Sequence, residues 1–149
     1  MSAYLPPALM DDWLERLQEN GYRLTGPRRT VVETIATSWQ VLSPLEVFER
    51  ARARYPSLGL VTVYRTLEKL EELALIQRVH TPAGCQTFIA SAPGHQHLLI
   101  CQNCGRFEYF SGDRLDTLMS DVQQESGYRI QDHWLQLFGV CTHCQSALD

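Results

Sequence analysis

The sequence predicts an α+β protein made of an N-terminal winged helix-turn-helix followed by a small α+β unit. Three observations lead to this class. Residues 9–75 carry four stretches of helical periodicity, residues 75–90 have the pattern of a two-stranded hairpin, and strand-like segments flank one further helix beyond residue 95. The 149 residues are enough for one domain or two small ones.

Apolar periodicity and end signals predict the four helices. The first spans residues 9–20, and Thr25 is the expected N-cap of the second. Ser43, with Glu46 three residues later, forms a capping box that opens the third helix, and Pro44 suits its first position. The side chains expected to face the core are Leu9, Trp13 and Leu17 in the first helix, Val31, Val32, Ile35 and Ala36 in the second, and Val63, Leu67, Leu70 and Ala74 in the fourth.

The fourth helix, residues 61–75, is followed by strand-like runs at 75–80 and 85–90 that flank a turn. Helices followed by such a hairpin make a winged helix-turn-helix, which we assign to residues 1–90. The segment Ser-Ala-Pro-Gly at 91–94 is the expected hinge.

The C-terminal unit is predicted to span residues 95–149. Strands are expected at 95–101, 106–111 and 128–140. The helix between the last two has the apolar stripe Leu115, Leu118, Met119 and Val122.

Bulk composition limits the class of protein. A hydrophobic content of 44% and a charged content of 20% predict a folded chain with a core. No apolar run approaches the roughly 18–20 residues that span a bilayer, and no export signal is visible, so we expect a cytoplasmic protein with no membrane partner. The net charge of −4 arises in residues 91–149, with three basic and seven acidic side chains, whereas residues 1–90 have ten of each. A local basic surface in the first unit is compatible with this distribution.

Cysteine spacing is the most specific chemical signal. Two C-x-x-C pairs lie 36 residues apart. Together they predict one tetrahedral structural zinc site of four thiolates. The alternative, a redox C-x-x-C, requires the motif to open a helix after a strand, whereas both pairs here end strand-like segments. The four ligands are Cys101, Cys104, Cys141 and Cys144.

A second metal-binding signal lies just before the first cysteine pair. His95 and His97 project from the same face of a strand, so both imidazoles can bind one ion. Strand parity would also let Cys101 join them, so periodicity leaves a mixed site open. The pair Cys141 and Cys144 favours two separate sites, because it offers Cys101 and Cys104 thiolate partners.

Four segments together resemble the ferric uptake regulator (Fur) family over almost the whole chain. They are "GYRLTGPRRTVV", "LVTVYRTLEKLEELALI", "HQHLLICQNCGRFEYF" and "GVCTHC", in this order. The resemblance implies a dimeric, metal-responsive transcriptional repressor with an N-terminal winged helix and a C-terminal dimerisation domain. The zinc-uptake-regulator branch of the family is one candidate.

The resemblance also implies DNA contacts. It puts Tyr64 against a base, Arg65 on phosphate, Arg23 at the minor groove and Arg28 near the backbone. Thr62 shares the polar stripe of the fourth helix, which has the dimensions to enter a major groove.

The same resemblance implies a regulatory metal site inside the dimerisation domain, built from His95, His97, Asp116 and His133. Three nitrogens and a carboxylate suit Zn²⁺, Fe²⁺, Mn²⁺ or Ni²⁺, and we expect zinc first and iron second. The family's other site, between the domains, lacks convincing ligands, since its positions hold Val41, Ile89, Gln96 and Leu98.

His80 and Cys85, on either side of the hairpin turn, are a possible alternative metal pair. The more ordinary interpretation is a surface histidine and an incidental cysteine.

Two other classes of protein share part of this pattern. A zinc-ribbon scaffold that binds RNA or a protein would share the four cysteines, but it would not need the "TVYRTL" helix or the His-x-His pair. A metal-dependent hydrolase would need a base at an open site, and although Asp116 and Glu108 are available, no substrate-pocket motif accompanies them. We therefore expect no catalytic residue and no enzyme. We expect a homodimer that represses metal-homeostasis genes at a palindromic operator when zinc is bound, with an iron-responsive regulator as the alternative.

Overall fold

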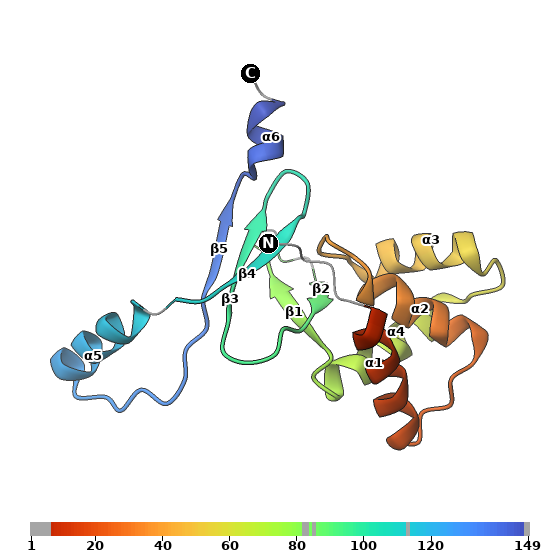
Figure 1. The fold of residues 1–149 in the computed structure, drawn as a ribbon, viewed down its shortest axis with the longest axis horizontal. Helices are drawn as coiled ribbons and strands as arrows, with labels where there is room; N and C mark the ends of the chain where they lie inside the picture. The colour runs from red at the N-terminus through yellow and green to blue at the C-terminus, as the bar shows by residue number, and fades with distance from the viewer. Residues whose placement is uncertain (1–6, 82–83, 85, 113, 148–149) are drawn as a thin grey trace. The chain divides into compact units, whose positions relative to one another are not determined.

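The computed structural model describes residues 7–81, 84, 86–112 and 114–147, with side chains from Met10 onward. The chain divides into two compact units, Met1–Ser91 and Ala92–Asp149. Figure 1 labels their helices and strands. Within the described ranges, no helix combines the length and the apolar composition needed to cross a bilayer.

The first unit is a winged helix-turn-helix, as predicted. It contains the helices α1 (Pro7–Glu19), α2 (Gly26–Ala36), α3 (Pro44–Arg54) and α4 (Leu60–Glu72), followed by the strands β1 (Ile76–His80) and β2 (Gln86–Ala90). The two strands pair antiparallel with Ile76 opposite Ala90 and His80 opposite Gln86, and form the wing (Figure 1).

Local signals in the sequence explain where the helices begin. The capping box at α3 closes in both directions, with Ser43 N–H donating to Glu46 Oε2 at 2.7 Å and Glu46 N–H donating to Ser43 Oγ at 3.2 Å. Thr25 takes the N-cap position of α2, as expected. The predicted stripe of α2 is buried, and so are Val63, Leu67 and Leu70 of α4. Trp13 and Leu17 of α1 join them, while the side chain of Leu9 lies outside the described residues.

The predicted burial of Ala74 is wrong. The helix α4 ends at Glu72, and Ala74 is exposed with a φ of 56°. The Leu75 N–H then donates to the Leu70 carbonyl at 2.9 Å, which closes the helix end and turns the chain into β1.

The second unit is built on a three-stranded sheet in the order β4-β3-β5. β3 (His97–Cys101) pairs antiparallel with β4 (Phe107–Phe110) and parallel with β5 (Gln136–Gly139). A parallel pair needs a long crossover, which α5 (Leu115–Ser126) and residues 127–135 supply. The predicted strand 128–140 was therefore too long, and the short helix α6 (Thr142–Ser146) was not predicted.

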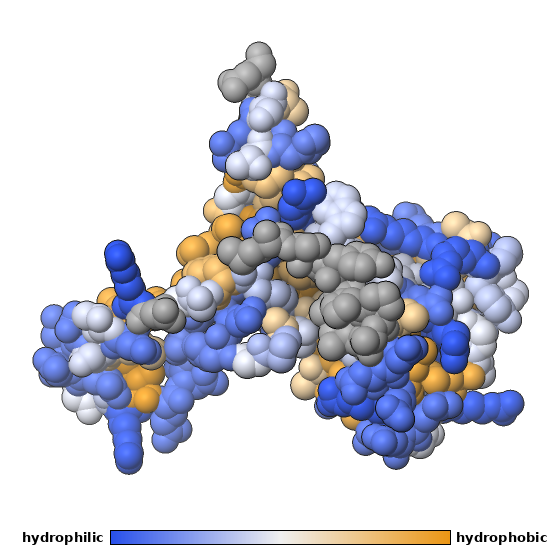
Figure 2. Space-filling model, in the orientation of Figure 1, coloured by the Kyte–Doolittle hydropathy of each residue, from blue (hydrophilic) through white to orange (hydrophobic). Residues whose placement is uncertain are grey.

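Much apolar surface of the second unit faces solvent. Leu98, Ile100 and Phe107 are buried in the sheet, but α5, all of whose side chains are described, buries none of them. Figure 2 shows hydrophobic surface over α5 and over the strands of this unit. Among the described residues of this unit, the large apolar side chains that are exposed are Leu99, Leu118, Val122, Tyr128, Trp134 and Leu137.

Candidate metal centres and nucleic-acid interface

The four predicted cysteines come together where β3 ends and α6 begins. Cys101 is the last residue of β3, and Cys141 is the N-cap of α6. One sulfur from each of the four cysteines lies within 4.8 Å of the other three. The Sγ atoms of Cys104 and Cys141 are 3.8 Å apart. A Zn–S bond of about 2.3 Å gives a tetrahedral S···S edge of about 3.8 Å, so the spacing suits one zinc ion.

Backbone N–H groups stabilise negative charge in this cluster. Burial raises the pKa of the Cys101 thiol, but backbone N–H groups of Cys141, Cys104 and Asn103 outweigh it and lower the pKa to about 6. The bond from the Cys141 N–H to Cys101 Sγ is 3.3 Å long. The pKa of Cys144 is raised to about 12, first by its hydrogen bond with Cys141 and then by burial. Without a cation the Cys144 thiol therefore resists losing its proton, and a divalent metal would remove that resistance.

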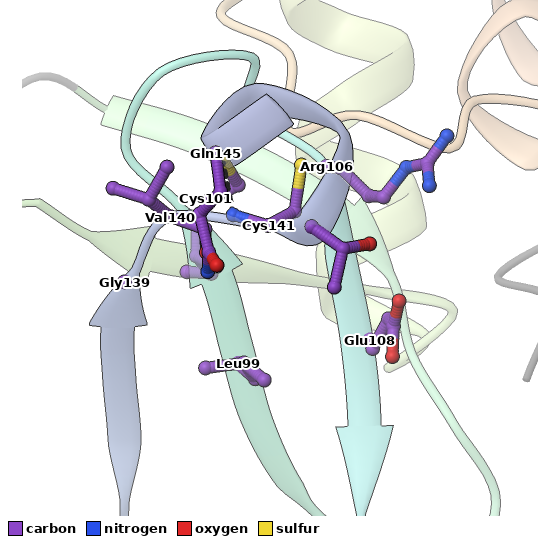
Figure 3. A pocket seen from close by; sticks show the side chains of 10 residues that line it. Leu99, Cys101, Arg106, Glu108, Gly139, Val140, Cys141 and Gln145 are labelled. Atoms are coloured by element: carbon purple, nitrogen blue, oxygen red, sulfur yellow. Dashed lines mark hydrogen bonds between the residues drawn. The ribbon is translucent and has the colours of Figure 1, made fainter. Parts of the chain in front are cut away.

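A groove of ≈ 260 Å³ lies below the cysteines against the sheet. In Figure 3 Cys101 and Cys141 approach each other at the top of the strands, and Leu99 lies farther down β3. Arg106 and Glu108 line the same groove from the β4 side. The cysteine cluster thus lies at the rim of a partly apolar groove.

Three histidines form a second cluster, separate from the cysteines. One ring nitrogen each of His95, His97 and His133 lies within 4.8 Å of the other two. The Nε2 atoms of His95 and His133 are 2.8 Å apart, although 38 residues separate them in sequence. His97 begins β3, and His133 belongs to the irregular segment before β5. The convergent imidazoles can therefore act together as ligands.

Burial distinguishes His97 from its two neighbours. Its side chain is 3% exposed. Burial, then the charges of His95 and His133, lowers the pKa of His97 below its usual value. Its ring also packs against Phe110, with the ring centroids 5.5 Å apart. A neutral imidazole held in a fixed orientation is the form that binds a metal.

The structure brings together three of the four expected regulatory ligands. Asp116 lies in the first turn of α5, is exposed, and is not part of the histidine group. Sequence reasoning missed Gly112, against which His97 packs: a Cβ there would lie 2.7 Å from His97 Cδ2 and 3.0 Å from Nε2. No sequence signal marks Gly112, since the contact depends on tertiary structure.

The alternative pair near the wing is only half described. His80 is exposed at the end of β1, whereas Cys85 lies outside the described residues. Of the four positions that lack inter-domain ligands, Ile89 and Leu98 are buried apolar side chains. Neither offers a donor atom to a metal.

The expected DNA-contacting residues all lie on the first unit. On α4, Tyr64 is 50% exposed and Arg65 is exposed, while Thr62 is half-buried and its carbonyl accepts a hydrogen bond from Thr66 Oγ1. Arg23 is exposed in the loop before α2. The exposed face of α4 thus combines an aromatic hydroxyl with a cation, which suits contact with bases and phosphates.

Arg28 is held against a residue that sequence reasoning missed. Its guanidinium carbon lies 4.4 Å from the centroid of the Tyr22 ring. Its Nη1 donates to the Arg23 carbonyl at 2.7 Å. The aromatic residue beside Arg23 was the available signal, but Tyr22 lies in a loop and Arg28 in α2, so no single helical or strand period relates them.

Comparison with known proteins identifies the family. The model of the ferric uptake regulator family matches residues 19–138. The ferric uptake regulation protein of Neisseria meningitidis is 29% identical over 134 residues, which cover 89% of this chain and 93% of that protein. The solved ferric uptake regulator of Helicobacter pylori, reported with three functional metal-binding sites, has a TM-score of 0.71 at 25% identity and covers 91% of this chain and 93% of that one.

A zinc uptake regulator solved with zinc and DNA has the same fold. Its TM-score is 0.69 at 19% identity, and the match covers 95% of each chain. At this identity the likeness concerns the fold alone. The family match spans most of the sequence, and the chain therefore belongs to the ferric uptake regulator family, whose members are metal-responsive transcriptional regulators and not enzymes.

Proposed function

We propose that this protein is a cytoplasmic repressor of metal-homeostasis genes that binds a palindromic operator as a homodimer when zinc occupies its histidine cluster. The observation that carries the proposal is the separation of two ligand clusters in the second unit, one of four thiolates and one of three imidazoles. One cluster suits a permanent ion and the other an exchangeable one.

The donor atoms support the division of roles. We assign a structural Zn²⁺ to Cys101, Cys104, Cys141 and Cys144, because four thiolates leave no open position. We assign the regulatory ion to His95, His97 and His133, with Asp116 as a fourth ligand that would have to rotate inward. When bound, this ion would cross-link the strand that starts at His97 to the segment before β5.

Zinc is favoured over iron by the ligand set. Three imidazoles suit Zn²⁺, whereas Fe²⁺ gains more from an additional carboxylate. The carboxylate of Asp116 is not among the grouped ligands. An iron-responsive regulator remains the alternative function, and a strongly bound Asp116 carboxylate would favour it.

Exposed apolar surface supports the homodimer. Leu118 on α5 is 56% exposed and Leu137 on β5 is 44% exposed. Exposed apolar surface on a helix none of whose residues is buried marks an interaction site. We propose that residues 95–149 dimerise, that residues 1–90 bind DNA, and that residues 91–94 act as the hinge.

The face of α4 supports DNA reading. We propose that Tyr64 contacts a base, that Arg65 and Arg28 contact phosphates, that Thr62 lies at the groove surface, and that Arg23 enters the minor groove. Because His95 and His97 follow the hinge directly, metal bound there would restrain the hinge's exit. That restraint would set whether two winged helices reach half-sites about one helical turn apart.

Metal titration with a DNA-binding readout tests the proposal. Protein treated with a mild chelator should retain one tight zinc per chain, measured by elemental analysis. Added zinc should then tighten binding to a duplex that the protein itself enriches from a randomised library. The expected gain is about 5–150-fold, the usual range of allosteric coupling.

Single-residue variants assign the response to a site. His97→Ala and His133→Ala should each abolish the zinc response and retain the tight zinc. His80→Ala and Cys85→Ser are the matched controls at the wing and should respond normally. A full zinc response in His133→Ala with none in Cys85→Ser would move the regulatory site to the wing. If iron tightens DNA binding by the wild type as much as zinc does, that result would favour the iron-responsive alternative.

A further inference from the structure

We infer that Tyr22 is a positioning residue for DNA binding, whose ring holds the Arg28 guanidinium ready for a phosphate while its hydroxyl anchors that arrangement to α4. The inference rests on the proposed DNA-binding function. It concerns a residue that lies before the helices that read DNA and that carries no charge of its own.

The Arg28 side chain is held at two points. Its guanidinium lies over the Tyr22 ring at 4.4 Å, and its Nη1 donates to the Arg23 carbonyl at 2.7 Å. A guanidinium over an aromatic face is attracted to the ring's quadrupole. The bond to Arg23 uses one of five N–H donors, so the remaining edge can face a phosphate. The same contact fixes the backbone of Arg23, the expected minor-groove residue.

The Tyr22 ring is itself anchored. Its hydroxyl lies 3.3 Å from Thr66 Oγ1, and Thr66 is fully buried on α4. Thr66 Oγ1 donates its only proton to the Thr62 carbonyl at 2.7 Å. The Tyr22 O–H must therefore be the donor in its bond to Thr66. One side chain thus connects the loop before α2 with the helix that carries Tyr64 and Arg65.

Charge favours a phosphate as the ligand of this arrangement. In the part of the chain that the structure describes, Arg54 pairs with Glu33 and Arg78 pairs with Glu71, but Arg28 makes no ion pair with a carboxylate. Exposed Arg23 and Arg29 lie beside it in sequence. Among the described residues no carboxylate pairs with Arg28, and a DNA phosphate would neutralise its charge.

Holding Arg28 in advance reduces the cost of ordering it on DNA. Ordering one long side chain at an interface costs enough to weaken binding by about 2–12-fold. Loss of the ring should therefore weaken DNA binding by a factor in that range, even though no charge is removed. It should also lower the salt dependence of binding, because an Arg28 side chain that the ring no longer holds occupies its phosphate contact for only part of the time.

The experiment measures log K against log salt on a random-sequence duplex and on the library-enriched duplex. Arg28→Ala should reduce the slope by about 0.9, the value for one phosphate contact. Tyr22→Leu, which removes the ring's face but keeps an apolar side chain, should reproduce most of that reduction on both duplexes. Tyr22→Phe keeps the ring but loses the hydrogen bond to Thr66 Oγ1, so its slope should lie between that of the wild type and that of Tyr22→Leu. The double variant of Tyr22→Leu with Arg28→Ala should match Arg28→Ala alone.

Two results would overturn the inference. A wild-type slope in Tyr22→Leu, when Arg28→Ala lowers it, would show that the ring does not position Arg28. An unchanged slope in Arg28→Ala would show that Arg28 makes no phosphate contact, so Tyr22 would have nothing to position. The proposed DNA-binding function would still hold if the wild type binds DNA with a salt-dependent affinity. Absence of any DNA binding by the wild type would instead be the failure of the proposed function.

If thermal melting shows that Tyr22→Leu folds poorly, Tyr22→Met replaces it, and the same salt slope is expected. A wild-type slope in Tyr22→Met would overturn the inference equally.

Discussion

The imidazoles of His95 and His133 meet through their Nε2 atoms at 2.8 Å, from segments that are far apart in sequence. At this distance one nitrogen donates and the other accepts, so a single proton joins the two rings. A metal ion would use both lone pairs and displace that proton. Protons and metal therefore compete for the same atoms.

The first prediction concerns pH. The pKa of His97 is lowered by burial and then by the charges of His95 and His133. The folded state therefore resists protonation of His97. Neutral His97 contributes its full stability above the pKa of the unfolded chain, about 6.5. This stability is lost as the pH falls from that value through the lower pKa of the folded state. Protein that retains only its tight zinc should melt at a lower temperature near pH 5 than near pH 7.5. His97→Gln should show a smaller difference, and an equal difference would contradict the prediction.

The second prediction concerns Gly112. An alanine Cβ there would meet the His97 ring at 2.7 Å and Leu115 Cδ1 at 3.1 Å. Its backbone does not need glycine for a positive φ, so the effect is steric. Gly112→Ala should displace the His97 ring and weaken regulatory metal binding by about 10–100-fold, the usual effect of disturbing a ligand's support. Gly139→Ala, where an added Cβ meets nothing within 4 Å, is the control. Unchanged zinc affinity in Gly112→Ala would refute the contact's role.

The third prediction concerns the cysteine cluster. Cys144→Ser replaces one of four grouped thiolates with a weak ligand. The variant should lose its tight zinc and dimerise poorly, because structural zinc contributes its binding free energy to folding. Elemental analysis and sedimentation measure the two effects. Cys85→Ser should leave both unchanged, and retention of one tight zinc with a normal dimer in Cys144→Ser would disprove the four-cysteine assignment.

The fourth prediction separates base contact from phosphate contact on α4. Tyr64→Ala should reduce the preference for the enriched duplex over random duplex more than it reduces total binding. Arg65→Ala should weaken binding to both duplexes about equally, because phosphate contacts carry little sequence information. Competition titrations with the two duplexes measure both quantities. Equal loss of preference in the two variants would contradict this division.

Features determined by neighbours in sequence could be predicted. The capping box of Ser43 and Glu46 needs only residues within one helical turn, and it closes as expected. The convergence of the four cysteines was also predictable, because each C-x-x-C pair prepares half of a tetrahedral site.

Features determined by distant contacts could not be predicted in this way. The apolar period of α4 was extended to Ala74, but the chain turns earlier so that Leu75 and Ile76 can enter the core. The strand expected from residue 128 starts at Gln136, where parallel pairing with β3 becomes possible. The bond between Tyr22 and Thr66 joins residues 44 apart, and no local pattern contains it.

Because β3 pairs with β5, the metal sites become complete only late in the synthesis of the chain. Each ligand cluster takes one part from residues 95–104 and the other from residues 133–144. A ribosome completes the first unit, which ends at Ser91, well before either cluster has all its ligands. At about 5–20 residues per second, the winged helix has seconds to fold while the chain lacks a complete metal site. A prematurely terminated chain that stops before β5 would therefore carry the winged helix without the four-cysteine zinc site, and on the proposed mechanism it would neither dimerise normally nor respond to metal.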